Sequence, residues 1–191
     1  EADNFGSLIQ PALEDVESVL QILQTKDFAG NLFLKSTHDR VLKILHQADY
    51  LRQKYHVVVA NPPYMGAKGM NGRMASYLRD NYKDVKSDLF SAFMVRNTKL
   101  VVKKGQLGFM TPFVWMFLSS YEKLRIFLIK QKTITSLIQL EYSGFDGATV
   151  PICTLTLQNN HDPDFKGGFI KLSDFRGAHN QAPKTLEAIK N

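Results

Sequence analysis

A run of β-branched residues that leads directly into two prolines constrains this chain more than any other feature. His56 is followed by three valines and an alanine, and the run ends in Asn61, Pro62, Pro63 and Tyr64. The valines do not alternate with polar residues, which is typical of a strand buried on both faces in the middle of a parallel sheet. Because proline cannot donate to a sheet ladder, we expect the strand to end where the prolines begin.

The rest of the sequence alternates helical and strand patterns, which predicts an α/β layered domain with a mostly parallel sheet. Apolar residues at helical spacing predict helices at 11–23 and at 37–53, the second capped by Thr37. A helix that begins at Ser87 and stops at the basic residues before Gly105 follows the first strand. Further elements are expected as a strand at 106–112, a helix at 119–131, strands at 134–142 and 151–158, and a short strand at 167–172 beyond the main sheet.

Composition and charge restrict the class of protein. The 191 residues are 44% hydrophobic, and no apolar run approaches the roughly 18 residues of a membrane helix. The one cysteine, Cys153, fits a reducing cytoplasm. The net charge is +6, but residues 51–104 carry eleven Lys and Arg against three Asp and Glu, a local net of +8. Such a basic segment indicates either a polyanionic partner or a solvated basic face.

The chemistry that residues 61–64 can perform follows from their position and stiffness. In open α/β sheets, ligands bind outside the carboxyl ends of the strands. The prolines hold the chain extended, so the Asn61 side-chain oxygen and nearby carbonyls form a rigid rim of acceptors beside the Tyr64 ring. Two fixed acceptors and a stacking ring suit a planar amine such as that of adenine, because binding both N–H groups frees the nitrogen lone pair. In a duplex, that base must first be flipped out.

A plainer interpretation of the same residues is a turn, since Asn-Pro and Pro-Pro are common in turns. The five histidines show no paired spacing typical of a metal site, so none is assigned as a ligand. Trp115 lies in an apolar stretch and is expected in the core.

At the Asn-Pro-Pro-Tyr stretch the chain resembles the amino-methyltransferases that use S-adenosylmethionine, whose signature is Asn/Asp-Pro-Pro followed by Tyr, Phe or Trp. It is most similar to the bacterial adenine-specific DNA methyltransferases of restriction-modification and phage-exclusion systems, including PglX-like enzymes. The segments that carry the resemblance span residues 3–158 and are EADNFGSLIQPA, NPPYMGAKGMN, VKSDLFSAFM, GQLGFMTPFVWMFLSSYEKLR and LIQLEYSGFDGATV. The resemblance implies methyl transfer from S-adenosylmethionine to the amine of a flipped-out adenine in double-stranded DNA, in the bacterial cytoplasm.

The resemblance also implies roles for individual residues. The tetrapeptide from Asn61 through Pro62 and Pro63 to Tyr64 would be catalytic: Asn61 and the Pro62 carbonyl would accept the amine hydrogen bonds, and Tyr64 would stack on the base. Phe145 would contact the base from another side. The cofactor would touch Asn61, Phe93 and Phe90, and DNA would be contacted by Lys68 and Arg73. Phenylalanines in an apolar helix usually pack, however, and both basic side chains have solvation as the alternative.

One departure from the family concerns the cofactor. The family carries a glycine-rich loop, typically Asp/Asn-Pro-Ala-Cys-Gly-Ser-Gly, and before Asn61 only Gly6 and Gly30 occur. The present strands would then be the half ordered 4-5-7-6 of a seven-stranded sheet, in a partial Rossmann-like S-adenosylmethionine-dependent methyltransferase fold. We expect residues 1–158 to be the C-terminal half of a catalytic domain cut from a longer enzyme. Residues 159–191 would extend towards a target-recognition region.

This expectation has two physical consequences. The strand at residues 57–61 would become an exposed apolar edge, which favours self-association or partial disorder. The chain alone is also expected to bind S-adenosylmethionine weakly or not at all.

Two other functions stay open. The same tetrapeptide serves methylation of glutamine side chains in release factors and of amines in ribosomal RNA, because a carboxamide also offers two N–H groups. A non-catalytic nucleic-acid-binding fragment is the other alternative. The segments WMFLSSYEKLR and FGSLI favour DNA.

Overall fold

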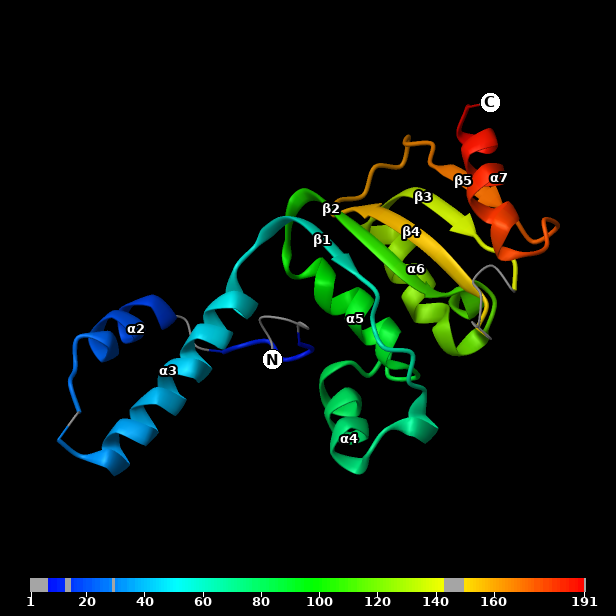
Figure 1. Ribbon diagram of the computed structural model, residues 1–191. Coiled ribbons are helices and arrows are strands. Elements are labelled where there is room, and N and C mark those ends of the chain that lie inside the picture. Colours follow the sequence, from blue (N-terminus) through cyan, green and yellow to red (C-terminus); the bar gives the residue numbers. More distant parts are fainter. Residues whose placement is uncertain (1–6, 13–14, 29, 143–149, 191) are drawn as a thin grey trace. The chain divides into compact units, whose positions relative to one another are not determined.

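The computed structural model describes residues 7–12, 15–28, 30–142 and 150–190, and its chain divides into two compact units between Lys54 and Tyr55 (Figure 1). This division is not the boundary predicted at residue 158. That boundary separates a catalytic domain from an extension within a longer enzyme, and it stays a prediction. Within the described residues, no helix is both long and apolar enough to cross a membrane.

The first unit is a pair of helices, α2 (Val16–Gln24) and α3 (Leu32–Arg52). Asp15 caps α2 by accepting the Ser18 N–H at 3.1 Å, and Asn31 caps α3. The prediction that Thr37 caps this helix is wrong, because Thr37 lies inside α3. The helices meet through a small apolar cluster of Val16, Leu20 and Leu45, supported by Leu23, Leu42 and Ala48.

The second unit is built on one five-stranded sheet in the order β1-β2-β4-β3-β5. Its strands are β1 (Tyr55–Ala60), β2 (Val101–Pro112), β3 (Thr133–Gln139), β4 (Ile152–Gln158) and β5 (Gly168–Lys171). The first four reproduce the predicted order 4-5-7-6. The sheet is mixed but mostly parallel, as expected: β4 runs antiparallel to both β2 and β3, while the other four strands share one direction. The strand expected beyond the main sheet is its edge, since β5 pairs in parallel with β3.

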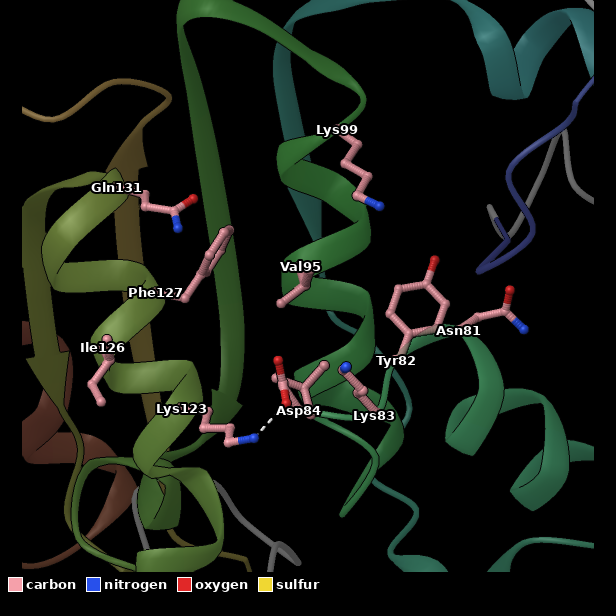
Figure 2. A pocket seen from close by; sticks show the side chains of 11 residues that line it. Asn81, Tyr82, Lys83, Asp84, Val95, Lys99, Lys123, Ile126, Phe127 and Gln131 are labelled. Carbon is pink, nitrogen blue, oxygen red and sulfur yellow. Dashed lines mark hydrogen bonds and ion pairs between the residues drawn. The ribbon is translucent and has the colours of Figure 1, made fainter.

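Helices α4 (Gly72–Asn81), α5 (Leu89–Thr98), α6 (Glu122–Gln131) and α7 (Ala178–Lys190) complete this unit, with short 3-10 turns at Ala67–Gly69, Phe113–Met116 and Ser119–Tyr121. Helices α5 and α6 lie side by side against the sheet (Figures 1 and 2). Both layers contribute buried apolar side chains: Leu107, Phe109, Leu155 and Leu157 of the sheet, and Phe90, Met94, Leu124 and Leu128 of the helices. The sequence pattern did not indicate α4 or α7.

The boundary between α5 and β2 differs from the prediction. The helix ends at Thr98, and β2 already begins at Val101, so the basic residues expected to stop the helix lie within a strand. The pairing of β1 with β2 shifts register just here, and Lys104 takes a positive φ of 65°. Pairing with β1 therefore outweighs the local helix-stop signal of the Lys-Lys-Gly sequence.

Candidate active site

The Asn-Pro-Pro-Tyr residues lie directly after β1, where the chain leaves the sheet. Because β1 and β2 are parallel, their carboxyl ends meet at one edge of the sheet, and this edge brings Tyr64 to the end of β2. The Tyr64 hydroxyl donates to the Asn61 Oδ1 at 2.9 Å and also lies 3.2 Å from the Met110 carbonyl oxygen. The structure thus brings together the two predicted site residues with the most direct chemical roles.

The four residues differ in exposure, and this difference decides what each can contact. Asn61 and Pro63 are exposed, Pro62 is buried and Tyr64 is half-buried. The Tyr64 ring packs against a cluster of Leu140, Ile152 and Leu172. Burial raises the pKa of the Tyr64 hydroxyl, with a smaller contribution from nearby Cys153, so the phenol stays a neutral hydrogen-bond donor. Asn61 therefore presents its carboxamide to solvent while Tyr64 holds its oxygen from the protein side.

Asp88 binds the chain after Tyr64 to helix α5, a role that the sequence pattern did not predict. Its Oδ1 accepts the Met65 N–H at 2.9 Å and the Phe90 N–H at 3.2 Å. The Leu89 N–H donates in turn to the Met65 carbonyl at 3.1 Å, next to an isolated antiparallel bridge between Gly66 and Asp88. Asp88, not the predicted Ser87, is the cap of α5. An Asp immediately before an apolar helical run was the signal available in the sequence.

Two further aromatic rings, those of Phe90 and Tyr121, pack behind Tyr64. Phe90 packs edge-on against Tyr64, with centroids 6.4 Å apart, and tilted against Tyr121 at 5.4 Å. Phe90 is 1% exposed, so its ring supports Tyr64 from within the core, whereas Phe93 keeps part of its surface accessible. Burial raises the pKa of Tyr121 to about 12, and the Asp88 carboxylate adds to this shift. A cofactor contact stays a prediction for both phenylalanines.

A buried polar cluster lies where β2 ends and β4 begins. The Trp115 Nε1–H donates to the Thr111 hydroxyl at 3.2 Å, and that oxygen lies 3.5 Å from the Cys153 sulfur. Trp115 is 4% exposed, which confirms its expected place in the core. Burial raises the pKa of the Cys153 thiol, so it acts as a small packing residue rather than a nucleophile.

The predicted nucleic-acid contacts lie on the surface next to the motif. Lys68 is exposed within the 3-10 turn Ala67–Gly69, and Arg73 is exposed in the first turn of α4, which Asn71 caps. Their contact with DNA stays a prediction. Phe145, predicted to touch the base, lies outside the described residues.

A hollow of the second unit does not coincide with the motif. It is an open groove of about 410 Å³ between α5, α6 and the chain after α4 (Figure 2). Lys123 and Asp84 both line the groove and form an ion pair, with the Lys123 Nζ 2.7 Å from the Asp84 Oδ1. No motif residue lines this groove, so we assign the candidate site by the motif's position at the sheet edge rather than by cavity size. In the described part of the chain, no three His, Cys, Asp or Glu side chains gather as metal ligands would.

Comparison with known sequences identifies the family. The profile of the Eco57I restriction-modification methylase family matches residues 11–145. The adenine-specific methyltransferase BrxX of Escherichia coli O9:H4 (strain HS) is 36% identical over 198 residues, which cover 100% of this chain and 16% of that protein. The adenine-specific methyltransferase PglX of Lacticaseibacillus casei (strain Zhang) is 31% identical, covering 98% of this chain and 16% of its own length. The chain thus spans about one sixth of these relatives.

Solved structures agree on the fold. A class I S-adenosylmethionine-dependent methyltransferase from Listeria monocytogenes superposes with a TM-score of 0.51 at 20% identity, covering 71% of this chain and 42% of that one. The Type ISP restriction-modification enzyme LlaGI, in complex with a DNA substrate mimic, gives a TM-score of 0.55 at 16% identity, covering 88% and 16%. The sheet order and these superpositions identify a partial Rossmann-like methyltransferase fold. With a family profile matched over most of its length, the chain belongs to the Eco57I restriction-modification methylase family.

Proposed function

We propose that this chain supplies the methyl-acceptor half of an enzyme that transfers a methyl group from S-adenosylmethionine to the exocyclic amine of a flipped-out adenine in DNA. The observation that carries the proposal is the placement of Asn61 and Tyr64 at the carboxyl end of β1, joined by a 2.9 Å hydrogen bond. Adenine-specific methyltransferases among the relatives support the choice of acceptor.

The Asn61 oxygen has capacity for this task. A carboxamide oxygen carries two lone pairs, and the Tyr64 hydroxyl uses one of them. The second can accept one amine N–H, and the Pro62 carbonyl would accept the other. Both bonds would favour a pyramidal nitrogen with a free lone pair, which is the nucleophile that an electrophilic methyl donor requires. The exposed side of the half-buried Tyr64 ring would stack on the base.

The residues present fit the cofactor in part. S-adenosylmethionine would supply an electrophilic methyl group, and the partly exposed Phe93 ring on α5 suits its adenine. Phe90 is 1% exposed and packs against Tyr64, so Phe93 is the stronger candidate of the two for this contact. We propose that the glycine-rich loop for the methionine part belongs to the full-length protein outside these 191 residues. Residues 159–191 would lead towards its target-recognition region.

DNA would approach over the surface beside the motif. Lys68 and Arg73 are exposed there and can neutralise phosphates without reading sequence. The complex of LlaGI with a DNA substrate mimic supports DNA as the partner.

The test uses the full-length protein, labelled S-adenosylmethionine and duplex DNA. Replacing Asn61 by Ala should lower the rate of adenine methylation by about 100- to 1000-fold, the usual effect of losing one preorganised hydrogen-bonding group. Asn180→Ala is the matched control: the side chain of this α7 asparagine donates to the Arg176 carbonyl and belongs to none of the proposed contacts, so the rate should not change. An Asn61→Ala enzyme with the normal rate would refute the proposal. Methylation of ribosomal RNA or release factor instead of DNA would refute the DNA substrate.

A further inference from the structure

We infer that Asp88 is a positioning residue for methyl transfer, because it holds the exit of the Asn61–Tyr64 motif against helix α5. The inference rests on the function proposed above and goes beyond it by naming a residue that touches neither the base nor the cofactor. The motif itself carries the acceptor groups, while α5 carries Phe93, the ring proposed to contact the cofactor. Asp88 is the side chain that joins these two parts.

Asp88 is a hydrogen-bond acceptor that two separate segments share. One carboxylate oxygen of Asp88, Oδ1, receives the Met65 N–H at 2.9 Å and the Phe90 N–H at 3.2 Å. Met65 directly follows Tyr64, and Phe90 lies in the first turn of α5. One atom therefore ties two segments that are more than twenty residues apart in the sequence.

Further hydrogen bonds hold the backbone around Asp88. The Leu89 N–H donates to the Met65 carbonyl at 3.1 Å, which closes a two-way link between the segments. The Ser91 hydroxyl, fully buried, lies 2.7 Å from the Asp88 carbonyl and 2.7 Å from that of Val85. The backbone of Asp88 is thus held from the helix side.

The link through Asp88 also reaches the ring that would stack on the base. The helix turn that Asp88 caps contains Phe90, and Phe90 packs edge-on against Tyr64. Movement of that turn would shift the support of Tyr64 and, through the hydroxyl, the orientation of the Asn61 carboxamide. In preorganised sites, a displacement of about 1 Å costs about 100-fold in rate. Loss of Asp88 should therefore act on the chemical step more than on binding.

The experiment compares Asp88→Ala and Asp88→Asn in the full-length protein, with steady-state methylation of duplex DNA. Alanine removes the shared acceptor, and we expect kcat to fall at least 10-fold while the KM values for DNA and S-adenosylmethionine change less than 3-fold. Asparagine keeps an acceptor oxygen at the same distance from the backbone, so Asp88→Asn should restore kcat to within about 3-fold. Asp15→Ala, which removes the cap of α2 alone, should leave kcat unchanged.

Two results would overturn this inference. One is an Asp88→Ala enzyme with kcat within 2-fold of the original, and the other is an Asp88→Asn enzyme as impaired as Asp88→Ala, because the charge and not the acceptor would then matter. Should the alanine variant fail to fold, Asp88→Ser takes its place. Serine caps α5 but its shorter side chain cannot bridge to Met65, so the same loss of kcat is expected and an unimpaired enzyme refutes the inference. Asn61→Ala, measured alongside, separates this failure from failure of the proposed function.

Discussion

At the scale of single residues, the Asn-Pro-Pro-Tyr motif combines a buried proline with an exposed asparagine. Pro62 is buried and Asn61 is exposed, so the chain is anchored while the carboxamide faces outward. The Tyr64 hydroxyl donates a hydrogen bond of 2.9 Å to the Oδ1 of Asn61, three residues earlier in the chain. The stiffness of this corner follows from its prolines, but the hydrogen bond requires the ring to be seated on the sheet.

The two parts of Tyr64 can be separated by substitution. Tyr64→Phe keeps the stacking ring and loses one hydrogen bond of about 0.5–1.5 kcal/mol, so kcat/KM for DNA in the full-length protein should fall about 2- to 12-fold. Tyr64→Ala also removes stacking of about 1–3 kcal/mol and should cost a further 5- to 150-fold or so. Equal losses in both variants would argue against stacking and leave the hydroxyl as the important group.

At the scale of elements, the start of β2 shows how pairing between strands decides local structure. Lys-Lys-Gly at the end of a helical pattern resembles a helix stop, yet the chain there is a strand that passes close to β1. A Cβ added to Gly105 would lie 2.7 Å from the His56 carbonyl oxygen and 2.5 Å from a methyl group of Val101. Glycine is required at this position by close approach of the neighbouring strand, not by a helix end.

This close approach predicts the effect of Gly105→Ala. The backbone oxygen of β1 cannot move away as a side chain can, so the variant should lose about 1–3 kcal/mol of unfolding free energy. Gly72→Ala is the control, because nothing lies within 4 Å of the added methyl group and the position is helical. That variant should be neutral or gain about 0.4–1 kcal/mol. Urea unfolding followed by circular dichroism measures both, and an unaffected Gly105→Ala protein would contradict the structure at this contact.

At the scale of the whole molecule, the sheet edge at β1 is the notable feature. Among the described residues, β1 pairs only with β2, and Val57 and Val59 are 60% and 77% exposed. The prediction that this strand would form an apolar edge is confirmed, whereas self-association through it stays a prediction. An apolar edge strand offers both its side chains and its backbone groups to another chain.

Self-association can be tested on the 191-residue chain by itself. Val59→Lys should shift the mass from light scattering towards the monomer, because a charged edge residue disfavours pairing. Ile189→Lys, at an exposed apolar position on α7, controls for added charge and should not shift it. A monomeric original chain with protected β1 amides would refute the expectation.

Stability at high pH is a second property of the whole molecule. Burial raises the pKa of Tyr82 and of Tyr121 to about 12. Because the folded state holds these protons more tightly than the unfolded chain, this contribution to stability is complete below pH 10 and is lost as pH rises from 10 to 12. Tyr82→Phe and Tyr121→Phe should each flatten the decline of unfolding free energy in that window. Unfolding series at several pH values measure the slopes.

The sequence alone determined the α/β class, the strand order of four of five strands, the core place of Trp115 and the family, since all depend on local pattern or on motifs read along the chain. It failed at α4, α7, the cap of α5 and the start of β2, where local signals were weak or were outweighed by pairing with a distant segment. The tertiary structure decided that Phe90 lies in the core, that Tyr64 holds Asn61 and that Asp88 joins the motif to α5. These contacts join residues that meet only when β1, β2 and α5 pack together. The order of residues along the chain does not specify the distances between such residues in the folded protein.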